Sequence, residues 1–281
     1  MKVLVTGASG RLGRAVRRRL ESRSGVEAVF LRHYTDGSRG DDAFAFDMTD
    51  MPRLHSVVST ARPDVIIHLA SITGLACDND PQLANAINVE VTIALAGIAA
   101  ELGTERIVFT STAAVYGDGY REPIHEGTPL RGASSYASTK QLAERGLVKC
   151  VETSANLSAV VLRIFNLYGD DFTDSVVQKL LTSTPDQPVR IHGLDRFVRD
   201  YVHVDDVVDA IMACVDAELT ARHQVINIGT GVPTSNRALL ERLGERRELY
   251  FDLVGEERES YSCADITRAA DILDFAPRLR L

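Results

Sequence analysis

The feature that most constrains how this chain can fold is a glycine-rich turn between an expected strand and an expected helix. The apolar run Lys2–Thr6 predicts the strand, and a basic amphipathic pattern over 11–21 predicts the helix. Gly7 permits a tight turn, Gly10 lets the backbone approach a diphosphate, and Gly13 lets helix and strand pack closely. The helix N-terminus then offers free N–H groups and a positive dipole end to that anion. Three glycines alone are a weak signal, but in this context they predict a dinucleotide-binding turn.

Strands and helices alternate along the first half of the sequence. Apolar and β-branched runs predict strands at 26–31, 44–47, 65–69, 106–111 and 159–164, and helical patterns cover 81–102 and 135–152. Such alternation is typical of parallel crossover units, and near-continuous apolar strands fit a sheet that is covered on both faces. We therefore predict an α/β fold with a doubly wound parallel sheet over residues 1–165.

The pattern loosens after residue 165, where Pro and Gly become denser between short elements. Strands are expected at 189–192, 198–202 and 225–228, and helices at 175–181, 205–216 and 235–244. Residues 166–281 are predicted to form a smaller α/β lobe that binds substrate. This lobe is expected to be partly interleaved with the first domain, so the boundary near residue 165 is soft.

Charge and composition exclude several functional classes. With 45% hydrophobic and 25% charged residues and a net charge of −8, the 281-residue chain has no general attraction for nucleic acid or an anionic membrane. No apolar run approaches the roughly 18 residues of a membrane helix, and a strand expected at residue 2 leaves no room for a signal peptide. The four cysteines have no spacing that suits a metal site or a redox pair. We expect a cytoplasmic protein without a metal.

The residue after the second expected strand, Arg32, bears on the choice of cofactor. A site that prefers NAD places an acid here, roughly 20 residues after the glycines, to bind the adenosine 2′-hydroxyl. An arginine can instead pair with the 2′-phosphate of NADP, so Arg32 favours NADP. NAD is the alternative, if Arg32 faces solvent and Asp36 reaches the ribose. Asp47 and Met48 are placed to contact the adenine, unless Asp47 only caps the next helix.

A phenol and an ammonium group, those of Tyr136 and Lys140, lie four residues apart on one face of the helix expected at 135–152. A free tyrosine titrates near pH 10, but a lysine cation and a bound positive nicotinamide favour the phenolate. Tyr136 could then exchange a proton with a sugar or alcohol oxygen while hydride moves, and Lys140 could hold the nicotinamide ribose.

Ser111 and Thr112 end a strand, so their hydroxyls are expected to face the reacting centre and one could bind the reacting oxygen. Capping of backbone groups is the alternative role for both.

Eight motifs occur in order along the chain. They are T-G-A-S-G-R-L-G (6–13), H-L-A-S (68–71), N-V-E-V-T (88–92), S-T-A-A-V-Y-G (111–117), Y-A-S-T-K (136–140), L-R-I-F-N-L-Y-G (162–169), R-D-Y-V-H-V-D-D (199–206) and N-I-G-T-G (227–231). Together they resemble the extended short-chain dehydrogenases/reductases of the NAD(P)-dependent nucleotide-sugar epimerase/dehydratase group. The resemblance spans essentially the whole chain, implies a Rossmann fold, and is more specific for the family than for the substrate.

This resemblance implies roles for individual residues. Tyr136 would be the acid–base residue with Lys140 as its partner, and Thr112 stands where UDP-galactose 4-epimerases carry their catalytic Ser or Thr. Asn166 would touch the diphosphate of a sugar nucleotide, and Arg199 would pair with its phosphates. The other residues expected along the dinucleotide are Ser9, Arg11, Leu12, Leu69, Ala70, Ser71 and Asn88.

Departures from the family pattern narrow the function. Ala113 and Ala114 stand where the 4,6-dehydratases carry Asp-Glu, so a dehydratase is not expected. The family's arginine-and-glycine stretch against the nucleotide base is altered over 255–259, where Arg258 is the nearby candidate for substrate binding.

The leading hypothesis is reduction of a nucleotide-activated 4-keto sugar by NADPH, and the alternative is a redox-neutral 4-epimerase that keeps NAD tightly bound. A third hypothesis, a non-catalytic dinucleotide-binding sensor, is disfavoured because Tyr136 and Lys140 are both present. The resemblance also implies a homodimer formed through the helices at 81–102 and 135–152.

Overall fold

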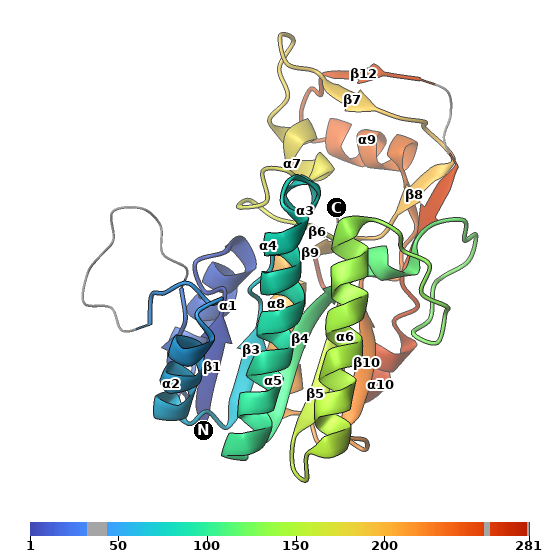
Figure 1. Cartoon of the computed structure of the whole chain (residues 1–281). Coiled ribbons are helices and arrows are strands. Elements are labelled where there is room, and N and C mark those ends of the chain that lie inside the picture. The colour runs from blue at the N-terminus through green and yellow to red at the C-terminus, as the bar shows by residue number, and fades with distance from the viewer. Residues whose placement is uncertain (33–43, 256–258, 280) are drawn as a thin grey trace.

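Six strands form a parallel sheet in the order β10-β5-β4-β3-β1-β2 (Figure 1) at the centre of the computed structural model, which describes residues 1–32, 44–255, 259–279 and 281. Their bounds are β1 Lys2–Thr6, β2 Glu27–Phe30, β3 Val65–His68, β4 Arg106–Thr112, β5 Ser158–Ile164 and β10 His223–Ile228. Every neighbouring pair in this sheet is parallel. The strand order reverses between β1 and β3, which confirms the doubly wound sheet and places a ligand crevice at the carboxyl ends of these two strands.

Helices cover both faces of the sheet because the strands send alternate apolar side chains to opposite sides. In β1, Val3 and Val5 join one core cluster, while Leu4 joins the other. The first layer contains α1 (Arg11–Glu21), α8 (Val204–Asp216) and α10 (Thr267–Leu273), and the second contains α2 (Met51–Ala61), α5 (Val91–Leu102) and α6 (Ser135–Thr153) (Figure 1).

Shorter elements from the second half of the chain build a smaller lobe beyond the carboxyl ends of the strands (Figure 1). They are β6 Asn166–Tyr168, α7 Val176–Leu181, β7 Val189–Ile191, β8 Phe197–Arg199, β9 Tyr201–His203, β11 Thr234–Ser235, α9 Asn236–Gly244, β12 Phe251–Leu253 and β13 Ser260–Ser262. The pairs β6·β9, β7·β12 and β8 with β11 and β13 hold it together. Because α8, β10 and α10 return to the main sheet, the chain passes between the two parts several times.

The strand expected at 44–47 is wrong. Ala45 forms a single parallel bridge with Arg32, and a turn begins two residues later. The carboxylate of Asp47 accepts hydrogen bonds from the N–H (2.9 Å) and the hydroxyl (2.8 Å) of Thr49. The backbone carbonyl of Asp47 accepts a further hydrogen bond from the Asp50 N–H. These local hydrogen bonds compete with strand pairing and end the extended segment.

The long helix expected at 81–102 forms, but in three parts: α4 (Pro81–Asn85), a π-helical turn (Ala86–Glu90) and α5. It follows α3 (Leu75–Asn79). Contrary to the sequence-based expectation, this helix is long and apolar enough to cross a membrane by length and composition alone. However, 56% of its most apolar stretch is buried inside the protein. Its apolar character therefore serves the core between α2, α6 and the sheet.

Candidate active site

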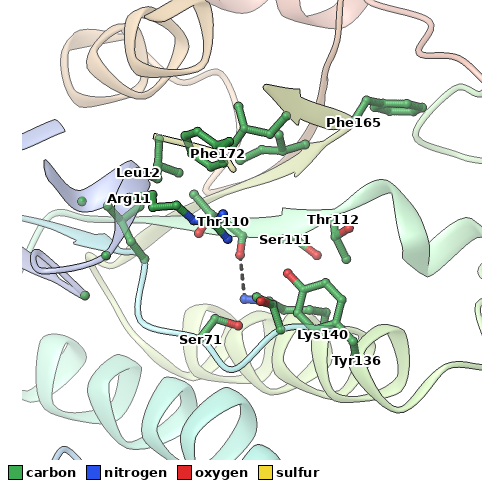
Figure 2. A pocket seen from close by; sticks show the side chains of 17 residues that line it. Arg11, Leu12, Ser71, Thr110, Ser111, Thr112, Tyr136, Lys140, Phe165 and Phe172 are labelled. Atoms are coloured by element: carbon green, nitrogen blue, oxygen red, sulfur yellow. Dashed lines mark hydrogen bonds between the residues drawn. The ribbon is translucent and has the colours of Figure 1, made fainter. Parts of the chain in front are cut away.

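A cavity of about 350 Å³ opens where the carboxyl ends of β1, β3, β4 and β5 meet the smaller lobe. It runs from the glycine turn to the first turns of α6 (Figure 2). Its lining includes predicted residues from four segments of the chain: Gly7, Gly10, Arg11, Leu12, Gly13, Leu69, Ser71, Ser111, Thr112, Tyr136 and Lys140. The fold thus brings the expected dinucleotide turn and the expected acid–base pair to one cleft.

Each glycine of the turn meets a steric requirement. Gly7 has φ +68°, and a Cβ on it would lie 2.6 Å from the backbone nitrogen of Ala70. A Cβ on Gly13 would lie 2.2 Å from the carbonyl oxygen of Gly7, so only glycine lets α1 begin this close to the turn. Gly10 is the N-cap of α1 and provides no side-chain cap. The first N–H groups of this helix are therefore available for an anion at the cavity.

His68, at the end of β3, orders the loop that faces the glycine turn. The Thr92 hydroxyl donates to the Asn88 carbonyl (2.8 Å), so it accepts from Nε2 of His68 (2.8 Å). This leaves Nδ1 to accept a hydrogen bond from the Thr6 hydroxyl (2.6 Å), whose oxygen in turn accepts two backbone N–H groups after β3 (3.2 Å each). His68 is therefore a neutral imidazole that holds the loop beside the diphosphate position.

We expect His68 to make folding stability depend on pH. Burial, aided by the nearby Lys140 charge, lowers the pKa of His68 to about 3 from 6.5. Between these pH values the unfolded chain binds more protons, so stability falls as pH is lowered from 6.5, by up to about 1.4 kcal/mol per pH unit. Urea unfolding at pH 7 and pH 5 should show a steeper loss for the wild type than for His68→Gln. Equal losses in the two proteins would contradict this assignment.

Asn88 lies in the π-helical turn and braces the same loop from behind. Its side chain accepts the Ile72 N–H (2.8 Å) and the Ser71 hydroxyl (3.1 Å), and donates to the Ile72 carbonyl (2.9 Å) and the Thr139 hydroxyl (3.0 Å). Thr139 stands between Tyr136 and Lys140 on α6. Asn88 thus connects the cofactor-side loop to the helix that carries the acid–base pair, and a π-helical turn at such a position is typical of functional sites.

Tyr136 and Lys140 both reach the cavity from the first turns of α6, which begins after the cap residue Ser134 (Figure 2). Lys140 is 1% exposed, and its ammonium donates to the Thr110 carbonyl at 2.9 Å. Burial lowers the pKa of Lys140 to about 7, against the opposing effect of Glu144. Burial raises the pKa of Tyr136 to about 12. A hydrogen bond with Ser71 opposes this rise, so for the chain by itself the expected lowering of the phenol pKa by Lys140 is not found.

The two hydroxyls at the end of β4 differ in what they contact. Thr112 borders the cavity, and its oxygen accepts the Ala114 N–H at 3.2 Å as the cap of the 3₁₀-helix Ala113–Tyr116. Ser111 lines the cavity too, but its hydroxyl donates to the buried carboxylate of Glu144. Thr112 thus takes the capping role that the sequence left as the alternative while it borders the cavity, and the Ser111 hydroxyl is directed to a buried carboxylate, which needs a donor, rather than to the reacting centre.

A second cavity of about 230 Å³ shares Thr112, Ile164 and Phe165 with the first and extends into the smaller lobe. Asn166 and Arg199 line it, as the resemblance implies for a diphosphate site. Asn166 donates its side-chain N–H to the Asp200 carbonyl at 3.2 Å. The guanidinium of Arg199 lies over the Phe197 ring at 3.8 Å from its centroid. Both predicted substrate residues thus sit beyond the reacting end of the dinucleotide cleft.

Some predicted residues lie outside the first cavity. Met48 is buried in the core under α2, and Asp47 is an exposed turn residue; neither lines the cavity. Ser9 and Ala70 flank the glycine turn without lining the cavity, and Arg258 lies outside the described residues. Conversely, sequence reasoning missed the apolar wall of the cavity, formed by Ile164, Phe165, Leu167 and Phe172. Three of these belong to the motif at 162–169, which was the available signal.

Arg11 is held at the cavity by the smaller lobe. Its guanidinium forms a two-point ion pair with the carboxylate of Asp174 and lies 5.0 Å from the centroid of Phe172. Arg14, one turn later, lies 3.5 Å from Asp171. These contacts fasten the segment after β6 across the start of α1, so this segment forms part of the cofactor cleft. Among the described residues, no group of three or more His, Cys, Asp or Glu could hold a metal ion.

The fold and this site define a dinucleotide-binding enzyme of the doubly wound class. Residues 3–229 match the family model described as the NAD dependent epimerase/dehydratase family, and the chain belongs to that family.

The chain is similar to individual members along its whole length. It is 30% identical over 303 residues to a UDP-glucose 4-epimerase of Mycolicibacterium smegmatis, covering 100% of this chain and 95% of the relative. The structure of MoeE5 in complex with UDP-glucuronic acid and NAD superimposes with a TM-score of 0.84 at 28% identity, covering 100% and 95%. The UDP-glucose 4-epimerase of Thermotoga maritima, solved with UDP-glucose, gives 0.81 at 26% identity, covering 100% and 94%.

Proposed function

We propose that this protein interconverts UDP-activated hexoses that differ in configuration at C4, with a bound nicotinamide dinucleotide as the hydride carrier. The observation that carries the proposal is the shared cleft: Tyr136, Lys140 and Thr112 stand between the glycine turn and the cavity lined by Asn166 and Arg199. Two of the three relatives named above are UDP-glucose 4-epimerases, which supports epimerisation over net reduction.

Each of these residues has a separate role in the proposed reaction. Tyr136 removes the proton from the C4 hydroxyl and later returns it, and Thr112 donates a hydrogen bond to the same oxygen as its charge develops. Lys140 holds the dinucleotide ribose and favours the phenolate. When bound, the dinucleotide would supply the acceptor and then the donor of the hydride at C4, so that the 4-keto sugar could be reduced from its opposite face. The positive charge of its oxidised form would oppose the effect of burial on the pKa of Tyr136.

This proposal is tested by incubating the purified protein with UDP-glucose and quantifying UDP-galactose. We expect interconversion without net consumption of cofactor, because the hydride returns to the sugar. Stoichiometric oxidation of NADPH with a 4-keto sugar, and no interconversion, would instead support the ketoreductase hypothesis. We also propose that this reaction takes place in the cytoplasm.

For the cofactor we propose that NADP binds at least as well as NAD. Arg32 follows shortly after β2. The preceding residue, Leu31, accepts a hydrogen bond from the Ala8 N–H with its carbonyl at 3.2 Å, so the backbone at Arg32 adjoins the glycine turn. An arginine at this place can pair with a 2′-phosphate. Arg32→Asp should weaken NADP binding roughly tenfold or more and leave NAD binding unchanged or tighter. Titrating both dinucleotides into both proteins checks this, and a clear NAD preference in the wild type would overturn it.

We further propose a homodimer formed through α5 and α6, which lie side by side on one face (Figure 1). Ile93 on α5 and Leu142 on α6 are 38% and 47% exposed. A Cβ on Gly146 would lie 2.4 Å from Ile93 Cγ1, so these two helices pack closely and present one apolar surface. Exposed apolar side chains of this kind favour covering by a second copy.

The dimer is tested with Leu142→Glu, which should give a monomer mass in light scattering because it buries a charge in the contact. Leu253→Glu is the matched control, since Leu253 is 56% exposed on β12 in the other lobe. A monomeric wild type, or a Leu142→Glu protein that remains dimeric, would contradict the proposed contact.

A further inference from the structure

The substrate cavity contains a carboxylate that the proposed reaction does not use. Asp118 lines this cavity together with Thr112, Asn166 and Arg199. It follows the 3₁₀-helix that begins after Thr112, so it lies on the segment that leaves the reacting end of β4. The Gly119 N–H (2.9 Å) and the Tyr261 N–H (3.3 Å) donate to one carboxylate oxygen, and the Ser260 hydroxyl donates to the other at 2.7 Å.

These donors keep the carboxylate charged. Burial by itself would raise the pKa of Asp118, but the hydrogen bonds from Ser260, Gly119 and Tyr261, together with the charge of Arg199, outweigh it and lower this pKa below its usual value. A carboxylate that accepts several hydrogen bonds is ionised at neutral pH. In the proposed function the sugar lies in this cavity between Thr112 and Arg199, so Asp118 would put a fixed negative charge near it.

Arg199 is the one lysine or arginine among the described residues that line this cavity. Its guanidinium donates to the Ser260 hydroxyl oxygen at 2.7 Å, so Ser260 connects Arg199 to Asp118. In the proposed function the diphosphate of the substrate occupies Arg199. The described lining then offers no further cation at this end, because the cationic groups of the first cavity, Arg11 and Lys140, contact Asp174 and the Thr110 carbonyl.

We propose that Asp118 makes this enzyme select UDP-hexoses that are neutral at C6 and reject UDP-hexuronates. This inference rests on the proposed function and specifies its substrate class. The backbone fold alone does not determine which of the two sugars binds, because MoeE5, which has the same fold, has been solved with UDP-glucuronic acid and with UDP-glucose. A C6 carboxylate would bring a third negative charge next to Asp118 with no cation besides Arg199 among the described lining residues to compensate it, and like charges brought together in this way are strongly unfavourable.

The test compares UDP-glucose with UDP-glucuronate as substrates of the NAD-loaded enzyme. In the wild type, kcat/KM for UDP-glucose should exceed that for UDP-glucuronate by about a hundredfold or more. In Asp118→Asn, which keeps the size of the side chain and removes its charge, this ratio should shrink by about tenfold. Asp252→Asn is the control, because it removes the same charge from exposed β12, far along the smaller lobe. Its ratio should match that of the wild type.

Calorimetric titration of both UDP-sugars into the same three proteins provides a readout that needs no turnover. Comparable kcat/KM values for the two sugars in the wild type would overturn the inference, as would a ratio that Asp118→Asn leaves unchanged while the variant still binds NAD. If neither sugar is epimerised, but UDP-glucose binds more tightly than UDP-glucuronate and Asp118→Asn narrows this difference, the epimerase proposal fails while the charge selection by Asp118 stands.

Discussion

Replacing Tyr136 by Phe is expected to lower kcat for C4 interconversion by about 10²–10⁴-fold at neutral pH, the usual contribution of a positioned acid–base group. The phenol is the group that borders both the glycine cleft and Thr112, and Lys140 stands one turn further along α6. Phenylalanine keeps the ring in the same wall of the cavity. Binding of the dinucleotide should therefore change by no more than a few-fold.

The measurement is steady-state conversion of UDP-glucose together with titration of NAD into the same preparations. Tyr250→Phe is the matched control, since it removes a phenol hydroxyl from the smaller lobe outside the cavity. It should retain wild-type kcat. A loss of less than tenfold in Tyr136→Phe would contradict the acid–base assignment, and the non-catalytic sensor hypothesis would gain support.

Removing the carboxylate of Glu144 is expected to cost about 3–5 kcal/mol in the free energy of unfolding, because the partner guanidinium stays buried and unpaired. The side chains of Arg163 and Glu144 are only 6% and 8% exposed, and two hydrogen bonds of 2.7 and 3.2 Å join them. The same carboxylate accepts the Ser111 hydroxyl. Arg163 also donates to the Tyr116 hydroxyl at 3.0 Å, so Glu144→Ala disturbs a connected network.

The free energy of unfolding is measured in urea for Glu144→Ala, for Arg163→Met and for the double variant Glu144→Met/Arg163→Met. The comparison distinguishes the cost of leaving one buried charge unpaired from the cost of removing both charges. The double variant should recover much of the loss, because no uncompensated charge remains. The exposed pair Arg237–Asp195 provides the control: breaking it with Asp195→Ala should change the free energy of unfolding only slightly, because solvent screens this pair. A cost of that small size for Glu144→Ala would show that the buried pair does not stabilise the fold.

Much of the fold and part of the site could be predicted because their signals are local. Gly10 and Gly13 lie against Gly7 and Ala8, and Gly7 has a positive φ, so the turn could be predicted from local geometry, although the close approach of Gly7 to Ala70 could not. Tyr136 and Lys140 share a helix face by their spacing alone. Local hydrogen bonds also explain why the predicted strand at 44–47 does not form. The N–H groups of Thr49 and Asp50, just beyond this segment, donate to Asp47 and end it.

Other features could not be predicted, because the partners lie far apart along the chain. The Ser111 hydroxyl turns to Glu144, 33 residues away, although the strand end alone suggested that it would face the reacting centre. Phe172 lines the cofactor cleft beside Arg11, which pairs with Asp174, 163 residues away. Neither partner is marked by any spacing in the sequence.

The sequence by itself determined the class of this protein: the glycine turn, the order of strands and helices, and the acid–base pair on one helix face follow from short-range geometry. Only the tertiary structure decided which hydroxyl at the end of β4 is available, which side chains wall the cleft, and which charges stand in the substrate cavity. Asp118 and Ser260 meet there although 142 residues separate them. The physical reason is that local spacing fixes backbone geometry, whereas burial, charge compensation and hydrogen-bond partners depend on which distant segments the folded chain brings together.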